Sequence, residues 1–134
     1  MQVKIPRKLI DEIGAHALDD APNECCGQIG AVEGQPTSVY RARNAFESPM
    51  RFDIHGEDLI RIHREMDERG EELLASYHSH PHSEARPSET DINIARTTLA
   101  GELWVICSLQ TGDPVVRMWR IGAGSVEEIE LVVE

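Results

Sequence analysis

The sequence predicts an α+β fold, with a single mixed, largely antiparallel β-sheet flanked by helices. First, 134 residues and 15.0 kDa suit one compact domain, which we expect to span residues 1–134. Second, segments with helical spacing of apolar residues lie between groups of segments with strand character, which favours α+β over a doubly wound sheet. Third, aromatic residues make up only 4% of the chain, so the core must be mainly aliphatic.

The N-terminal third predicts one helix and two strands. A helix opens near Pro6 and ends before Pro22, with an apolar stripe at helical spacing. The stripe consists of Leu9, Ile10, Ile13 and Ala17. Residues Cys26 to Val32 and Val39 to Ala45 form two strands, which we expect to pair as a hairpin around the turn-like Gly34-Gln35-Pro36.

The middle of the chain predicts a second helix, a strand and a third helix. Phe52 and Ile54 belong to a short extended piece before the second helix, which ends at Gly70. The apolar face of that helix consists of Leu59, Ile62, His63 and Met66. An apolar strand from Leu73 to Ser79 is closed by Pro81, and after a polar loop a third helix begins near Ser88.

The C-terminal part predicts three consecutive strands. They cover Trp104 to Leu109, Val115 to Ile121 and Val126 to Val133, separated by glycine-containing turns. Such short connections join antiparallel neighbours, so we expect an antiparallel meander.

Composition excludes several classes of function. The net charge of −11 repels polyanions, so we expect no nucleic-acid partner. The longest apolar run, Leu103 to Cys107, is far too short to cross a membrane, and the first residues have no apolar stretch typical of a secretory signal. We therefore expect a cytoplasmic protein with its three cysteines reduced. The quaternary state stays open, and a homodimer is one option.

Three histidines fall within the short stretch Tyr77-His78-Ser79-His80-Pro81-His82. On a strand, side chains two residues apart share a face with Cα atoms about 6.5 Å apart, so His78 and His80 can bind one metal ion. Catalytic zinc usually takes three protein ligands and one water. The loop after Pro81 leads to a helix start where Asp91 can reach the same ion, so His78, His80 and Asp91 form the predicted ligand set.

Each part of this pattern also has an ordinary structural explanation. A His-x-His sequence is commonly two solvated or hydrogen-bonded histidines, and Ser88 with Asp91 fits a capping box at a helix N-terminus. The joint order of His-x-His-Pro, six residues, Ser, two residues and Asp, with a strand before and a helix after, favours the metal site.

The segments His78-Ser79-His80-Pro81 and Pro87-Ser88-Glu89-Thr90-Asp91 resemble the signature of the JAMM (MPN-plus) metalloproteases. Weaker matches at 43–45, 48–52 and 70–73 resemble the short prokaryotic branch that includes peptidases acting on sulfur-carrier proteins. The resemblance covers nearly the whole chain and implies the MPN/JAB architecture, which is similar to that of cytidine deaminases.

The resemblance also implies roles for named residues. Glu24, in Pro22-Asn23-Glu24-Cys25-Cys26-Gly27, corresponds to the family's general acid/base, and Ser88 corresponds to the serine that stabilises the oxyanion. One zinc ion per chain would be held by the ligand set above. The implied reaction is hydrolysis of an amide or isopeptide bond at the C-terminal tail of a ubiquitin-like or sulfur-carrier protein.

Three alternatives remain at this stage. Cys25, Cys26 or Cys107 with a histidine would suit a thiol nucleophile, although cysteines in apolar strands usually behave as small hydrophobes. A non-catalytic MPN-type interaction module would not need the five motif residues. A zinc deaminase would need a Pro-Cys-x-x-Cys motif, which the sequence lacks. His82 and Glu84 match no ligand position, so we expect them at the loop or rim.

Overall fold

The computed structural model describes residues 2–97, 103–122 and 124–134. The helices are α1 (Arg7–Asp20), α2 (Gly56–Arg69) and α3 (Glu89–Thr97). The strands are β1 (Gln2–Ile5), β2 (Cys26–Val32), β3 (Gln35–Ala42), β4 (Glu72–His80), β5 (Leu103–Ser108), β6 (Val115–Ile121) and β7 (Val126–Val133). In the described residues, no helix has the length and apolar character needed to cross a membrane.

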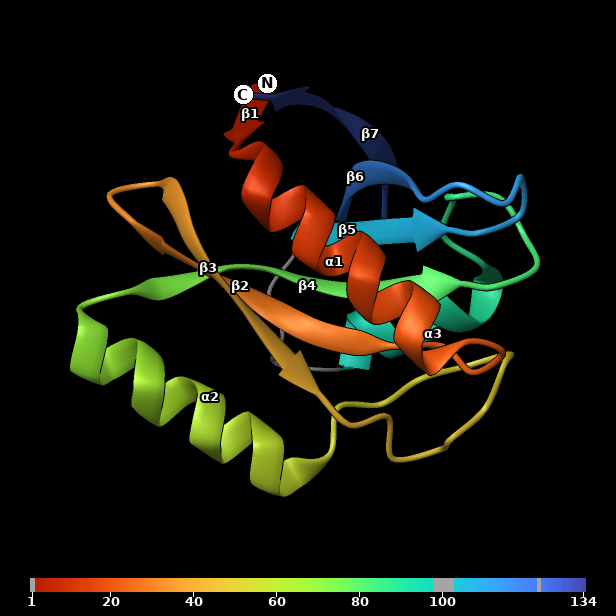
Figure 1. Ribbon diagram of the computed structural model, residues 1–134, viewed down its shortest axis with the longest axis horizontal. Helices are drawn as coiled ribbons and strands as arrows, with labels where there is room; N and C mark the ends of the chain where they lie inside the picture. The colour runs from red at the N-terminus through yellow and green to blue at the C-terminus, as the bar shows by residue number, and fades with distance from the viewer. Residues whose placement is uncertain (1, 98–102, 123) are drawn as a thin grey trace.

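The strands form one sheet in the order β1-β7-β6-β5-β4-β2-β3, which confirms the predicted α+β class (Figure 1). Four neighbouring pairs are antiparallel, while β4 with β5 and β1 with β7 are parallel. The predicted meander is therefore confirmed as β5, β6 and β7. Strand β1 was not predicted, because its four residues gain their burial from pairing with β7 at the opposite end of the chain.

Helices cover both faces of the sheet and divide the core in two. Helix α1 crosses one face, where Leu9 and Ile13 pack against Ile29 and Val105 (Figure 1). On the other face, Ile62 of α2 and side chains of α3 belong to a second cluster that contains Trp104. Alternate residues of one strand face opposite clusters, as the pleat of a strand requires.

The predicted hairpin is confirmed, but the predicted position of its turn was wrong. The turn residues are Glu33 and Gly34, whose φ angles of 51° and 79° suit a tight two-residue hairpin. Pro36 lies in β3 rather than in the turn, opposite Ala31 beside a bulge. Because β3 is an edge strand, a residue without an N–H is tolerated there. The strand also ends at Ala42, three residues before the predicted Ala45.

The second helix has the predicted end, and its predicted apolar face is confirmed except for His63. Gly70 adopts the left-handed conformation with φ of 68° and its N–H bonds back to the last turn. Ile62 and Met66 are buried, Leu59 is half-buried and His63 is exposed.

Strand β4, helix α3 and strand β5 form a parallel crossover that prepares one end of the sheet for a site. The C-terminal end of β4 and the N-terminal end of α3 meet there, as they do at binding sites of other parallel crossovers. His80 is the last residue of β4 and Ser88 directly precedes α3.

Gly27 is expected to tolerate no side chain. It lies in β2 between β3 and β4, and a Cβ there would overlap the Tyr40 carbonyl oxygen and meet the Tyr77 ring at 2.5 Å. We expect Gly27→Ala to lower the free energy of unfolding by about 1 to 3 kcal/mol, measured by urea denaturation. Gly56→Ala is the matched control, because nothing lies within 4 Å of its Cβ. Equal stabilities of the two variants would contradict the prediction.

Candidate metal centre

Three side chains from β4 and α3 converge on one point. Nε2 of His78 and Nε2 of His80 lie 3.2 Å apart, and Oδ2 of Asp91 lies 3.1 Å and 2.9 Å from them, respectively. The three side chains are 1%, 4% and 3% exposed. The structure thus brings the three predicted ligands together as a buried group that could hold a metal ion.

A hydrogen bond at His80 Nδ1, on the side of the ring away from the cluster, determines that Nε2 faces the cluster as an acceptor. His80 Nδ1 lies 2.7 Å from the carbonyl oxygen of Glu84, which can only accept, so Nδ1 carries hydrogen. In the neutral ring, Nε2 then presents a lone pair toward the carboxylate oxygen of Asp91. Two acceptors at 2.9 Å need a proton or a metal cation between them.

Protonation of the two imidazoles differs because their surroundings differ. Complete burial lowers the pKa of His78, against the opposing effect of Asp91. Burial also disfavours the charged form of His80, but its hydrogen bonds to Asp91 and Glu84 raise its pKa overall. Without a metal ion, a proton on His80 therefore takes the place of the cation.

Asp91 is held in place by a reciprocal capping interaction with Ser88. The Asp91 N–H donates to Ser88 Oγ at 3.1 Å, and the Ser88 N–H donates to Asp91 Oδ2 at 2.9 Å. The capping box and the metal-ligand position are thus compatible. Although burial opposes ionisation, His78, His80 and the Ser88 N–H hold the pKa of Asp91 far below its usual range. Within the described part of the chain, the Ser88 hydroxyl donates to no acceptor, so its proton can be given to another group.

Glu24 lies between α1 and β2, and its carboxyl group is close enough to His80 and Asp91 for their charges to change its pKa. Its side chain is 4% exposed, and burial raises its pKa to about 8, a shift that His80 opposes and Asp91 reinforces. Its backbone N–H donates to the Ser48 carbonyl at 2.8 Å. A buried carboxyl group with a raised pKa is suited to proton transfer near neutral pH.

Unsatisfied buried atoms support a cation at this site. Within residues 2–97, 103–122 and 124–134, Glu24 Oε1, Asp91 Oδ1 and His78 Nδ1 are buried without a hydrogen-bond partner. Two of these atoms are carboxylate oxygens, and an unpaired buried acceptor is unfavourable unless water or a cation is nearby. Two imidazoles and one carboxylate match a zinc ligand set, so the residues present fit that ion.

Aromatic side chains support the His78 ring, which sequence reasoning did not predict. Phe52 stacks on it with ring centroids 4.2 Å apart and an interplanar angle of 17°. Trp104 meets the same ring edge-on at 6.1 Å. Phe52 and Trp104 also line a cavity of about 570 Å³ between α2 and α3. Phe52 comes from the β3–α2 connection, and no sequence spacing links it to His78.

The three cysteines do not suit a nucleophile. All are buried, and burial raises the pKa of Cys25 to about 12 and of Cys107 to about 11. The pKa of Cys26 is raised for the same reason. A catalytic cysteine needs an accessible thiolate, which these surroundings disfavour.

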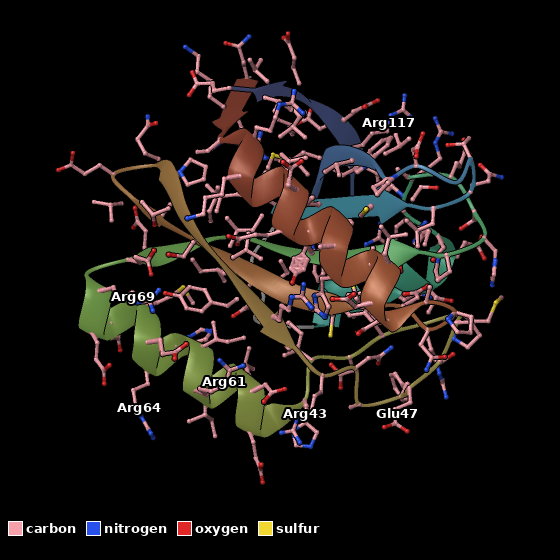
Figure 2. The ribbon with its side chains drawn as sticks, viewed as in Figure 1. Arg43, Glu47, Arg61, Arg64, Arg69 and Arg117 are labelled. Carbon is pink, nitrogen blue, oxygen red and sulfur yellow. The ribbon has the colours of Figure 1, made fainter. Side chains whose placement is uncertain are left out.

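The remaining candidates lie at the rim, as predicted. His82 is exposed, and the Glu84 side chain is exposed although its carbonyl group contacts His80. Figure 2 shows Arg43 beside the N-terminal end of α2 and Glu47 on the loop between β3 and α2. Asp58 binds the Arg43 side chain at 3.0 Å and its backbone N–H at 2.7 Å.

Several known proteins are similar to this chain in sequence and in fold. The family model described as prokaryotic homologs of the JAB domain matches residues 6–122. A CysO-cysteine peptidase of Mycobacterium tuberculosis is 34% identical over 125 residues, covering 90% of this chain and 83% of that protein. A probable TtuB-protein conjugate cleaving protease of Thermus thermophilus is 32% identical over 130 residues, covering 96% and 81%. A solution structure from Desulfitobacterium hafniense has a TM-score of 0.87 at 28% identity, covering 100% of this chain and 93% of the other.

Proposed function

Because the chain belongs to the family of prokaryotic homologs of the JAB domain, we propose that it is a zinc-dependent metallopeptidase that hydrolyses an amide or isopeptide bond. The resemblance to JAMM proteins inferred from the motif is thereby confirmed. The observation that carries the proposal is the buried convergence of His78, His80 and Asp91, with the carboxyl group of Glu24 in the same environment. This chain covers 83% and 81% of the length of two relatives, which are named as a peptidase and a protease.

The proposed roles follow from the position of each group. His78, His80 and Asp91 would hold one zinc ion per chain, which when bound supplies a Lewis acid and lowers the pKa of water. Glu24 accepts the proton of the attacking water on a carboxylate oxygen and returns it to the amine nitrogen that leaves. Water and amide are thereby converted to a carboxylic acid and an amine.

Ser88 is proposed as the donor to the oxyanion. Its Oγ already accepts the Asp91 N–H, so its own hydrogen is directed away from the helix. One such donor typically contributes about 2.7 to 4 kcal/mol to the transition state. The capping interaction holds the hydroxyl group in position for this role.

We propose the C-terminal tail of a ubiquitin-like or sulfur-carrier protein as substrate. The names of the mycobacterial and Thermus relatives support this class. An extended tail can reach a buried centre that a folded domain cannot enter. Here the three proposed ligands and Glu24 are each at most 4% exposed. The three free, buried cysteines support a reducing, cytoplasmic setting for the reaction.

The test combines metal content with product analysis. The purified chain is incubated with carrier proteins from the same genome, each extended at its C-terminus, and tail trimming is followed by mass spectrometry. We expect about one zinc ion per chain and loss of mass at the tail, and both should disappear after chelation. A chain purified without chelator that contains no metal and trims no tail would favour the non-catalytic interaction module instead.

A further inference from the structure

The loop 44–54, between β3 and α2, is closed at its base. Asn44 and Ile54 form an isolated antiparallel bridge. Next to them, the Ala45 N–H donates to the Asp53 carbonyl at 2.8 Å. The two ends of the loop are therefore fixed to each other, and whatever the loop contacts is held relative to β3.

The side chain of Asn44 uses all of its hydrogen-bonding capacity, with three bonds inside this loop and one to Glu24. Its Nδ2 donates to the carbonyl oxygens of Glu24 at 3.1 Å and Arg51 at 3.0 Å. Its Oδ1 accepts from the N–H groups of Phe46 at 3.0 Å and Asp53 at 3.2 Å. Two donors and two acceptors are what an amide side chain offers, so no isosteric residue makes the same four bonds.

These four bonds connect both halves of the candidate centre. On one side, the Glu24 carbonyl accepts from Asn44 while its N–H donates to Ser48 of the same loop. On the other side, Asn44 binds the residues directly before and after Phe52, whose ring stacks on His78. One buried amide thus connects the segment of the general base with the aromatic support of a metal ligand.

We propose that Asn44 is a positioning residue for the hydrolysis, which sets the placement of Glu24 relative to His78. The inference rests on the proposed function but assigns Asn44 no contact with substrate or metal. Its side chain acts through the backbone of Glu24 and through the loop around Phe52. Displacing a reacting group by about 1 Å can lower a rate about 100-fold, so a clamp of this kind has a large effect on turnover.

The decisive variant is Asn44→Asp, because it keeps the acceptor for Phe46 and Asp53 but removes the donors to the carbonyl groups of Glu24 and Arg51. We expect kcat to fall about 10- to 100-fold, with KM within about threefold of the wild-type value and about one zinc ion per chain retained. Asn23→Asp is the matched control: it places the same new charge next to Glu24 and leaves the clamp intact. Equal kcat values for the two variants, or loss of zinc from Asn44→Asp, would overturn the proposal.

A second measurement uses the wild-type protein and needs no substrate. Amide hydrogen exchange should show the N–H groups of Phe46, Asp53 and Glu24 protected about 100-fold or more, although they lie outside regular strands. Exchange of the Phe46 and Asp53 amides at the rate of an open loop would refute the clamp, even if Asn44→Asp fails to fold. Absence of hydrolysis in the wild type, with these amides protected, would instead count against the proposed function alone.

Discussion

Replacing Glu24 with glutamine is expected to lower kcat by about 1,000-fold while leaving zinc content and folding unchanged. Glutamine has nearly the same shape as glutamate, but its amide cannot accept a proton from water. Glu24 Oε1 is buried without a hydrogen-bond partner among the described residues, so the variant loses no hydrogen bond to this atom. Removing a group with a pKa raised by burial should if anything stabilise the fold. Turnover, zinc content and the thermal midpoint should be measured on the same preparation.

Glu89→Gln is the matched control for that experiment. Glu89 is exposed at the first turn of α3, two residues before Asp91, so the same chemical change is made close to the site without entering it. We expect its kcat within about twofold of wild type. Near-normal turnover in Glu24→Gln would remove Glu24 from the role of base, and zinc loss in that variant would show that Glu24 binds the metal.

Local sequence patterns were sufficient for most of the fold. Helices α1 and α2 have apolar residues at helical spacing with clear end signals at Pro22 and Gly70, so periodicity located both. Strands β5, β6 and β7 were found because short turns separate apolar runs. Strand β1 was missed because a four-residue strand has no periodicity of its own and depends on a partner more than 120 residues away.

The candidate centre, like the fold, could be predicted from the sequence only in part. His78, His80 and Asp91 were predicted because strand and helix geometry at short range brings them together, and the structure agrees. The roles of Asn44, Phe52 and the Glu84 carbonyl were not predicted, although the weaker family matches at 43–45 and 48–52 contain the first two residues. They act through loop backbone and ring stacking, which depend on tertiary contacts and leave no spacing that can be recognised in one sequence.

Removing a metal ligand is expected to have the largest effect of all. In His78→Ala or Asp91→Ala, only two of three ligands remain, and we expect zinc affinity to fall by far more than the roughly 10- to 100-fold typical of changes around a ligand. Turnover should fall to background in both variants. His82→Ala is the control, because it makes the same change in the third histidine of the stretch, whose side chain is exposed. Zinc retention in His78→Ala would contradict the proposed ligand set.

Asp91 has a second role that a well-chosen variant separates from metal binding. Because Asp91 Oδ2 also accepts the Ser88 N–H, Asp91→Ala should lose about 0.5 to 2 kcal/mol of stability from the helix cap in addition to zinc. Asn at this position keeps a carbonyl oxygen for the cap but carries no negative charge for the metal. We therefore expect Asp91→Asn to be more stable than Asp91→Ala in urea denaturation but less stable than the metal-free wild type, whose Asp91 carboxylate is stabilised by His78 and His80. Its zinc binding should be as weak as that of Asp91→Ala. If Asp91→Asn instead retained tight zinc binding and turnover, the carboxylate would serve α3 alone, and the third ligand would have to be another group.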